Sequence, residues 1–174
     1  GKFEKTVVQL DKWHFYDKSK TNAEIVLDFY RLVLDAAGDM LIIGCDTLSH
    51  LSAGLVHIYR TGDDTSGREW KRTKEMGVNT LAFRLAQNEI FYMCDADCVG
   101  ILKDKVPWEK NSQWLHLLSY SNTPLFISCT DEINEKKRAD IKEAYRVFNQ
   151  PHEIKPVDIF GTRTPEKWLI DGKE

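Results

Sequence analysis

The sequence lacks a strong excess of charge, a long apolar run and a cysteine-rich framework. Its 24 basic and 27 acidic residues leave a net charge of −3, whereas proteins that bind nucleic acid by neutralising phosphates carry a clear basic excess. The longest apolar runs, such as residues 40–43, fall well short of the roughly 20 residues that span a bilayer. We therefore expect neither a nucleic-acid partner nor a membrane partner.

Motifs for metals and cofactors are also scarce. Cys94 and Cys98 have a C-x3-C spacing without a second cysteine pair or a nearby histidine, which a structural zinc site requires. No Gly-x-Gly-x-x-Gly, Walker loop or Gly-x-Ser-x-Gly elbow follows any predicted strand. We therefore expect no metal and no cofactor. The cysteines, interpreted as free thiols, are Cys45, Cys94, Cys98 and Cys129, and the scattered histidines are His14, His50, His57, His116 and His152.

Strand and helix patterns alternate along a chain of 174 residues, about the length of one domain. Short apolar segments predict strands at residues 6–10, 40–44, 56–60, 89–94 and 124–128. Helical periodicity predicts helices at residues 22–37, 48–55 and 133–148, with Asn22 capping the first, and places residues 113–119 within a helix. A Ser66–Glu69 capping box opens a further helix that runs through Trp70 to about Met76. Such alternation favours an α/β fold with a parallel sheet and helices outside it.

Acidic residues follow four successive predicted strands, where α/β proteins collect functional groups. A rim of carboxylates fits metal binding, contacts to sugar hydroxyls or acid–base chemistry, and aspartate is also a common turn residue. The rim comprises Asp11, then Cys45 with Asp46, then Arg60 with Asp63 and Asp64, then Asp95 with Asp97. The interleaved aromatic residues fit either sugar stacking or packing under helices; they are Trp13, Phe15, Tyr16 and Trp70.

Several motifs carry a family resemblance. They are Leu41-Ile-Ile-Gly-Cys45, residues 48–56 (LSHLSAGLV), residues 60–67 (RTGDDTSG) with Trp70, and Asp95-Ala-Asp97-Cys98. Their order and spacing resemble the α-galactosidase (melibiase) type of glycoside hydrolase over residues 5–150. In that family Gly-Cys ends strand five, Arg-x-x-x-Asp follows strand six and Asp-Pro-Asp-Cys follows strand seven. Ala96 stands here in place of the proline.

The resemblance implies retaining hydrolysis of terminal α-galactosides by two carboxyl groups, which that mechanism places about 5–5.5 Å apart. It assigns the general acid/base to Asp64 and the nucleophile's place to Asp11. Gln9 stands where the family has lysine. Cys45 and Asp46 are expected to contact the sugar ring near its 2-position. The predicted sugar-binding set also includes Arg60, Asp63, Gln9 and Trp13.

The resemblance also implies a partial (β/α)8 barrel, containing about strands four to eight. Residues 1–150 would form the C-terminal part of the catalytic barrel, and residues 151–174 a linker and the first strand of a C-terminal β module. Because a full barrel takes about 250 residues, we expect a fragment that is inactive alone and is covered by the missing N-terminal half or by a second copy. The family favours a periplasmic or secreted location, and the start at Gly1 indicates a removed tag or leader.

Two other functions remain open from the sequence. A non-catalytic remnant that binds carbohydrate or only assembles is favoured by Gln9 and by the missing strands. A metal-dependent α/β hydrolase would use the acidic rim, although the histidines lack ligand spacing. The sugar itself, an α-galactoside, an α-N-acetylgalactosaminide or a related pyranoside, is not fixed by the motifs.

Overall fold

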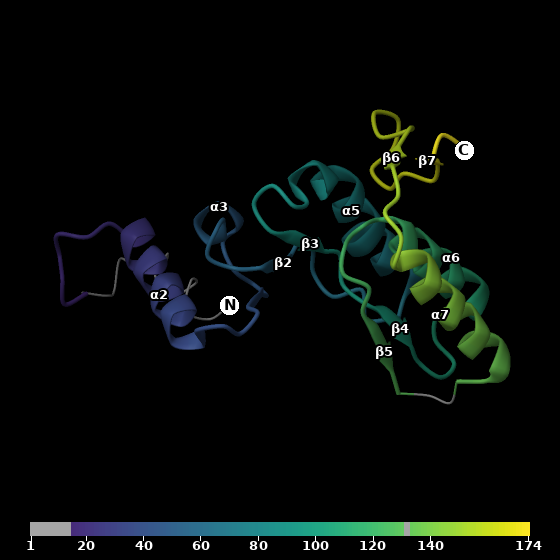
Figure 1. The fold of residues 1–174 in the computed structure, drawn as a ribbon, viewed down its shortest axis with the longest axis horizontal. Helices are drawn as coiled ribbons and strands as arrows, with labels where there is room; N and C mark the ends of the chain where they lie inside the picture. Colours follow the sequence, from purple (N-terminus) through teal and green to yellow (C-terminus); the bar gives the residue numbers. More distant parts are fainter. Residues whose placement is uncertain (1–14, 131–132) are drawn as a thin grey trace.

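The computed structural model describes residues 15–130 and 133–174, in which helices surround short strands. Helix α2 lies at one end of the molecule and helices α6 and α7 at the other (Figure 1). The helices are α2 (Asn22–Ala37), α3 (Ser49–Ser52), α4 (Trp70–Arg72), the π-helix η2 (Thr73–Val78), α5 (Asn79–Arg84), the 3-10 turn η3 (Leu85–Gln87), α6 (Trp108–Tyr120) and α7 (Glu135–Phe148). The strands are β1 (Ile43–Gly44), β2 (Ile58–Arg60), β3 (Met93–Asp95), β4 (Val99–Ile101), β5 (Ile127–Cys129), β6 (Ile154–Pro156) and β7 (Trp168–Ile170).

Helix α2 matches the predicted range, but its cap is Thr21 and not Asn22. The Thr21 hydroxyl accepts a hydrogen bond from the Glu24 amide, and the Glu24 carboxylate accepts one from the Thr21 amide. This reciprocal capping box satisfies two of the amides left free at the helix start. Gly38, with φ of 56°, ends the helix. The cap therefore lies one residue earlier than the periodicity indicated.

Strands β1, β2 and β3 form a parallel sheet in that order, and β4 pairs in parallel with β5. Strands β6 and β7 form an antiparallel hairpin. The protein is therefore mixed α/β with short parallel sheets, as the sequence predicted. The described ranges contain no closed barrel. The predicted strand at residues 6–10 lies outside them.

The register of β1, β2 and β3 divides their side chains between two faces of the sheet. Gly44 pairs with Tyr59 and Tyr59 with Cys94, and this row faces a buried cluster. Because side chains alternate along a strand, the neighbouring row of Ile43, Ile58 and Met93 faces the other way. Ile43 and Met93 there are 48% and 37% exposed. Arg60 and Asp95 lie one step further along this same face, where Asp95 is buried.

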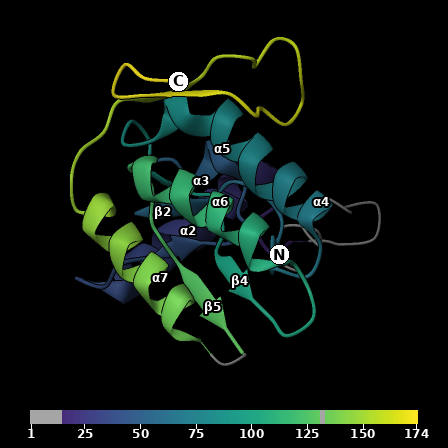
Figure 2. The same ribbon diagram turned by 90° about the vertical axis from the view of Figure 1, so that its right-hand side faces the viewer.

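The largest buried cluster lies where α6 packs against α7, η2 and α5 (Figure 2). Trp114 and Leu118 of α6 are almost fully buried in it. Gly77 in the π-helix lets the Trp114 ring approach, since a Cβ there would lie 2.8 Å from that ring. The cluster fixes the helix layer against β4, whose pairing with β5 the sequence did not predict.

Several predicted boundaries were wrong, and local contacts explain why. The Ser66–Glu69 capping box is absent: Ser66 has φ of 48°, and Glu69 precedes the helix without a side-chain cap. The helix then continues past residue 76 through the π-helix into α5. Helix α6 begins at Trp108, directly after Pro107, and contains residues 113–119, which were predicted to be helical. Proline favours a helix start because its missing amide is not needed there.

The last 24 residues contain two strands, as predicted, but the first of them was predicted at the wrong residues. Residues 157–160 were predicted to be β-forming, whereas the strand is Ile154–Pro156 and residues 158–161 turn. The second prediction, residues 168–170, was correct. Two hydrogen bonds connect the segment before the hairpin to the end of α6. The Asn122 side-chain amide donates to the His152 carbonyl, and its oxygen accepts from the His152 amide.

The close approach of the 65–67 turn to β4 predicts a large effect of Gly100→Ala. A Cβ at Gly100 would lie 2.5 Å from the Ser66 backbone carbon and 2.6 Å from the Gly67 amide nitrogen. Since neither backbone group is free to move, we expect a loss of about 1–3 kcal/mol in the free energy of unfolding, measured by urea denaturation. The matched control is Gly161→Ala, whose Cβ meets only Asp158 O at 3.5 Å. Equal stability of the two variants would contradict this packing.

Candidate functional site

Arg60 is the centre of a cluster of carboxylates at the carboxyl end of β2. Its Nε lies 2.9 Å from Asp95 Oδ2, its Nη2 lies 2.9 Å from Asp97 Oδ1, and its Nη1 lies 3.3 Å from Asp64 Oδ1. The cross-strand pairing of Arg60 with Asp95 places the first contact. One guanidinium therefore joins three carboxylates from two adjacent strand ends.

The two carboxylates from the β3 end are buried, whereas Asp64 is open. The side chains of Asp95 and Asp97 are 1% and 6% exposed, that of Arg60 is 18% exposed and that of Asp64 is 69% exposed. The two short contacts of Arg60 go to the buried pair, so most of its charge is compensated there. Asp64 is the member of the cluster that faces solvent.

The turn after β3 holds Asp97 by its backbone and side chain. The Asp97 amide donates to Asp95 Oδ1 at 2.7 Å, and Asp97 itself has φ of 73°. Asp97 Oδ2 accepts from the Thr65 amide at 2.6 Å and from the Thr65 hydroxyl at 3.0 Å. Thr65 thereby links the loop after β2 to the loop after β3.

Arg60 and Asp97 are both held in their ionised forms. Burial acts to raise the pKa of Asp97, but the amides of Thr65 and Cys98 and the Arg60 charge bring it below its ordinary value. Burial acts to lower the pKa of Arg60, but the hydrogen bond that Arg60 donates to Asp95 and the charges of Asp95 and Asp97 raise it. The Arg60–Asp97 pair is therefore ionic at neutral pH.

Arg72 fixes the backbone of the loop that carries Asp64. Its Nε donates to the Asp64 carbonyl at 2.7 Å, and its Nη2 lies 2.7 Å from Asp63 Oδ2. Asp63 Oδ1 accepts from the Asp64 amide at 2.8 Å, and this bond, with Arg72, lowers the pKa of Asp63. Asp63, expected to contact sugar, is thus engaged within its own loop.

The other predicted site residues lie at different distances from this cluster. Cys45 follows β1 and is exposed. Asp46 is exposed in a left-handed conformation. Trp70 lies against the helical core cluster and does not join the carboxylates. The remaining predicted residues, Gln9, Asp11 and Trp13, lie outside the described residues.

Sequence reasoning missed two positioning residues, Thr65 and Arg72. Thr65 follows the Arg-x-x-x-Asp motif directly, so a hydroxyl residue next to Asp64 was a signal that the sequence contained. Arg72 lies eight residues beyond Asp64 on a helix whose start was predicted too early. Nothing in its spacing pointed back to the loop.

The thiols next to the cluster are protected, which makes alkylation a test of its packing. Burial raises the pKa of Cys94 and Cys98 to about 11, and for Cys98 the Asp97 charge adds to this effect. At pH 8 we expect iodoacetamide to modify the exposed Cys45 and Cys129 and to spare Cys94 and Cys98. Peptide mass spectrometry measures this directly.

The raised pKa of Cys98 also predicts how the stability of the folded chain changes at alkaline pH. A thiol with a raised folded pKa stays protonated in the folded chain while the unfolded chain ionises near 9.0, so this contribution to stability is lost as pH rises from about 9 to about 11. Cys98→Ser should flatten that part of the stability profile. Labelling of Cys98 at pH 8 as fast as Cys45 would contradict the burial of this thiol.

Within residues 15–130 and 133–174, no three His, Cys, Asp or Glu side chains are grouped to hold a metal ion. Among the described helices, none is both long and apolar enough to cross a membrane. Comparison with protein-family models and with curated proteins finds no match to this sequence.

Proposed function

We propose that this chain carries the acid/base half of a glycoside hydrolase site at the carboxyl edge of a parallel sheet. The observation that supports it is the Arg60 cluster, in which one exposed carboxylate, Asp64, is set beside two buried ones. A fixed carboxyl group open to solvent suits proton transfer to a leaving oxygen. Within this class we propose the α-galactosidase (melibiase) type, because the cluster is built from the Arg60-to-Asp64 and Asp95-to-Cys98 motifs.

The strand order supports a partial (β/α)8 barrel. β1 pairs with β2, β2 with β3, and β4, three residues after β3, pairs with β5, all in parallel. The strands of each parallel sheet thus follow one another in sequence, as barrel strands do, whereas β3 and β4 do not pair with each other. In this proposal β3 and β4 are the two ends of strand seven, separated by the turn that presents Asp97.

The proposed roles follow from exposure and position. Asp64 protonates the glycosidic oxygen and later accepts a proton from water, and Asp11 attacks the anomeric carbon. Arg60 is a positioning residue for Asp64 because two buried carboxylates hold it. Cys45 and Asp46, exposed at the end of β1, contact the sugar beside its 2-position. Gln9, Trp13 and Asp63 complete the proposed sugar contacts.

A second candidate, a non-catalytic remnant that binds carbohydrate or assembles, is favoured by one specific observation. Ile43 and Met93 are exposed on the face that carries the cluster, and a barrel would fill that face with side chains from all its strands. The proposed partners are therefore the N-terminal half of the barrel or a second copy of the chain. A monomer by light scattering that binds no apolar dye would contradict self-association.

The product anomer tests the proposed class of reaction. The barrel polypeptide extended upstream of residue 1 is mixed with an aryl α-galactoside, an aryl α-N-acetylgalactosaminide and an aryl β-galactoside. Retaining hydrolysis predicts that proton NMR detects the α-anomer of the released sugar first, from one of the two α-glycosides. Release of the β-anomer first, or cleavage of the β-galactoside alone, would contradict the proposal.

A further inference from the structure

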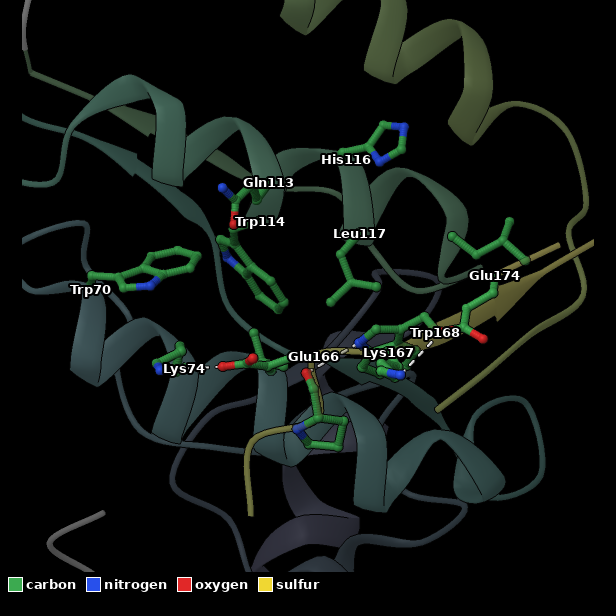
Figure 3. Close-up of a pocket in the computed structure, with 13 residues that line it drawn as sticks. Trp70, Lys74, Gln113, Trp114, His116, Leu117, Glu166, Lys167, Trp168 and Glu174 are labelled. Atoms are coloured by element: carbon green, nitrogen blue, oxygen red, sulfur yellow. Dashed lines mark hydrogen bonds and ion pairs between the residues drawn. The ribbon is translucent and has the colours of Figure 1, made fainter. Parts of the chain in front are cut away.

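A cavity of about 620 Å³ lies between the helix layer and the C-terminal hairpin. Three segments that are distant in sequence line it: α4 with η2, α6, and the stretch from Pro165 through β7 (Figure 3). Its volume is within the range of small-ligand sites, about 300–1,000 Å³. None of the residues of the Arg60 cluster lines it.

Two half-buried indoles, Trp70 and Trp168, face this cavity from opposite segments. The Trp168 Nε1–H donates to the Pro165 carbonyl at 3.3 Å, whereas the Trp70 Nε1–H has no hydrogen-bond partner among residues 15–130 and 133–174. Figure 3 shows the Trp70 ring pointing into the space below α6. The Trp70 indole offers an apolar ring face and an N–H donor, which suits a ligand that has both apolar and polar surfaces.

The charged groups around the cavity balance one another. Lys74 lies 3.9 Å from Glu166, and Lys167 lies 3.5 Å from Glu174. Two cations against two anions leave no net charge to attract a phosphate or a cationic ligand. Both pairs are loose, and all their members except the half-buried Lys74 are largely exposed, so their charged groups are available to hydroxyls. The exposed amide of Gln113 adds a donor and an acceptor.

We propose that this cavity is a saccharide-binding site separate from the Arg60 cluster. A neutral saccharide is the ligand class that fits, because its C–H faces pack on indoles while its hydroxyls bond amides, carboxylates and ammonium groups. The proposal rests on the cavity and does not require hydrolytic activity. It assigns a second sugar site to a chain whose proposed first site lies at the sheet edge.

Fluorine NMR of the full chain, labelled with 5-fluorotryptophan, tests this site. The sequence has five tryptophans, and Trp70→Phe and Trp168→Phe identify the two signals. Raffinose, maltotriose and cellotriose are titrated separately as neutral trisaccharides. We expect at least one of them to shift the Trp70 and Trp168 signals and to leave Trp108, which does not line the cavity, unchanged.

Three variants separate this site from the sheet edge. Gln113→Ala is expected to weaken the binding about tenfold, and the matched control Gln150→Ala, exposed outside the cavity, should leave it unchanged. Asp64→Asn should also leave the Trp168 shift in place. The proposal is overturned if no trisaccharide moves the Trp70 and Trp168 signals, if Gln113→Ala binds normally, or if Asp64→Asn abolishes the shifts. Loss of hydrolysis alone bears only on the first site.

Discussion

Under the proposed function, Asp64→Asn in a complete barrel that contains this chain should lower hydrolysis of an alkyl α-galactoside by about 10²–10⁴-fold, the usual contribution of a positioned acid. An alkoxide leaves slowly unless it is protonated, and the amide of asparagine has no proton to transfer in this role. An α-galactoside of a strongly acidic phenol needs little protonation, so its first bond cleavage should be largely spared. The ratio of kcat/KM values for the two substrates measures the effect.

The control for this prediction is Asp35→Asn, which removes an exposed carboxylate from α2. Its activity should equal that of the unchanged protein with both leaving groups. An equal loss for the two substrates in Asp64→Asn would contradict the acid role. In that event Asp64 would act through sugar binding or through the loop that Arg72 holds.

Arg60→Ala should cost about 3–5 kcal/mol of unfolding free energy, because it leaves Asp95 and Asp97 buried without their partner. Asp97 still accepts from Thr65, but its negative charge is no longer compensated. Urea denaturation of the full chain measures this loss. The same variant should detach Asp64 from the cluster and so lower activity further than the stability change explains.

Two further variants test whether buried charge causes the loss. Asp97→Asn introduced into Arg60→Ala should recover part of the stability, because one uncompensated charge is then removed. Arg146→Ala breaks an exposed pair with Glu143 and should cost less than about 1 kcal/mol. If Arg60→Ala cost no more than Arg146→Ala, the cluster would be a surface feature and not the organiser of the site.

The α/β class could be predicted because its signals are local. The apolar stripe and Gly38 defined α2 to its last residue, and short apolar segments located β1, β2 and β3. Their boundaries were less accurate, since only two or three residues in each segment pair with a neighbour. The edge at which the carboxylates gather followed from the rule that parallel strands end together.

Features that depend on tertiary contacts were not predictable from the sequence pattern. The Ser66–Glu69 spacing fits a capping box, but Ser66 has a left-handed conformation in a turn that packs closely against Gly100. Strand β4 is only three residues long and is defined by its pairing with β5. The use of Arg72 and Thr65 to hold the loop likewise depends on the fold. The relation of Asp97 to Arg60 emerged only from the side-by-side placement of β2 and β3.

Hydrolysis of an aryl α-galactoside by two polypeptides tests the central proposal most directly. One is the 174-residue chain, and the other is the same chain extended upstream to a complete barrel. If the chain carries the acid/base half of an α-galactosidase site, only the longer polypeptide releases the phenol, and Asp64→Asn suppresses hydrolysis of the alkyl substrate in it. Absence of hydrolysis by both, with the longer polypeptide folded, would contradict that account.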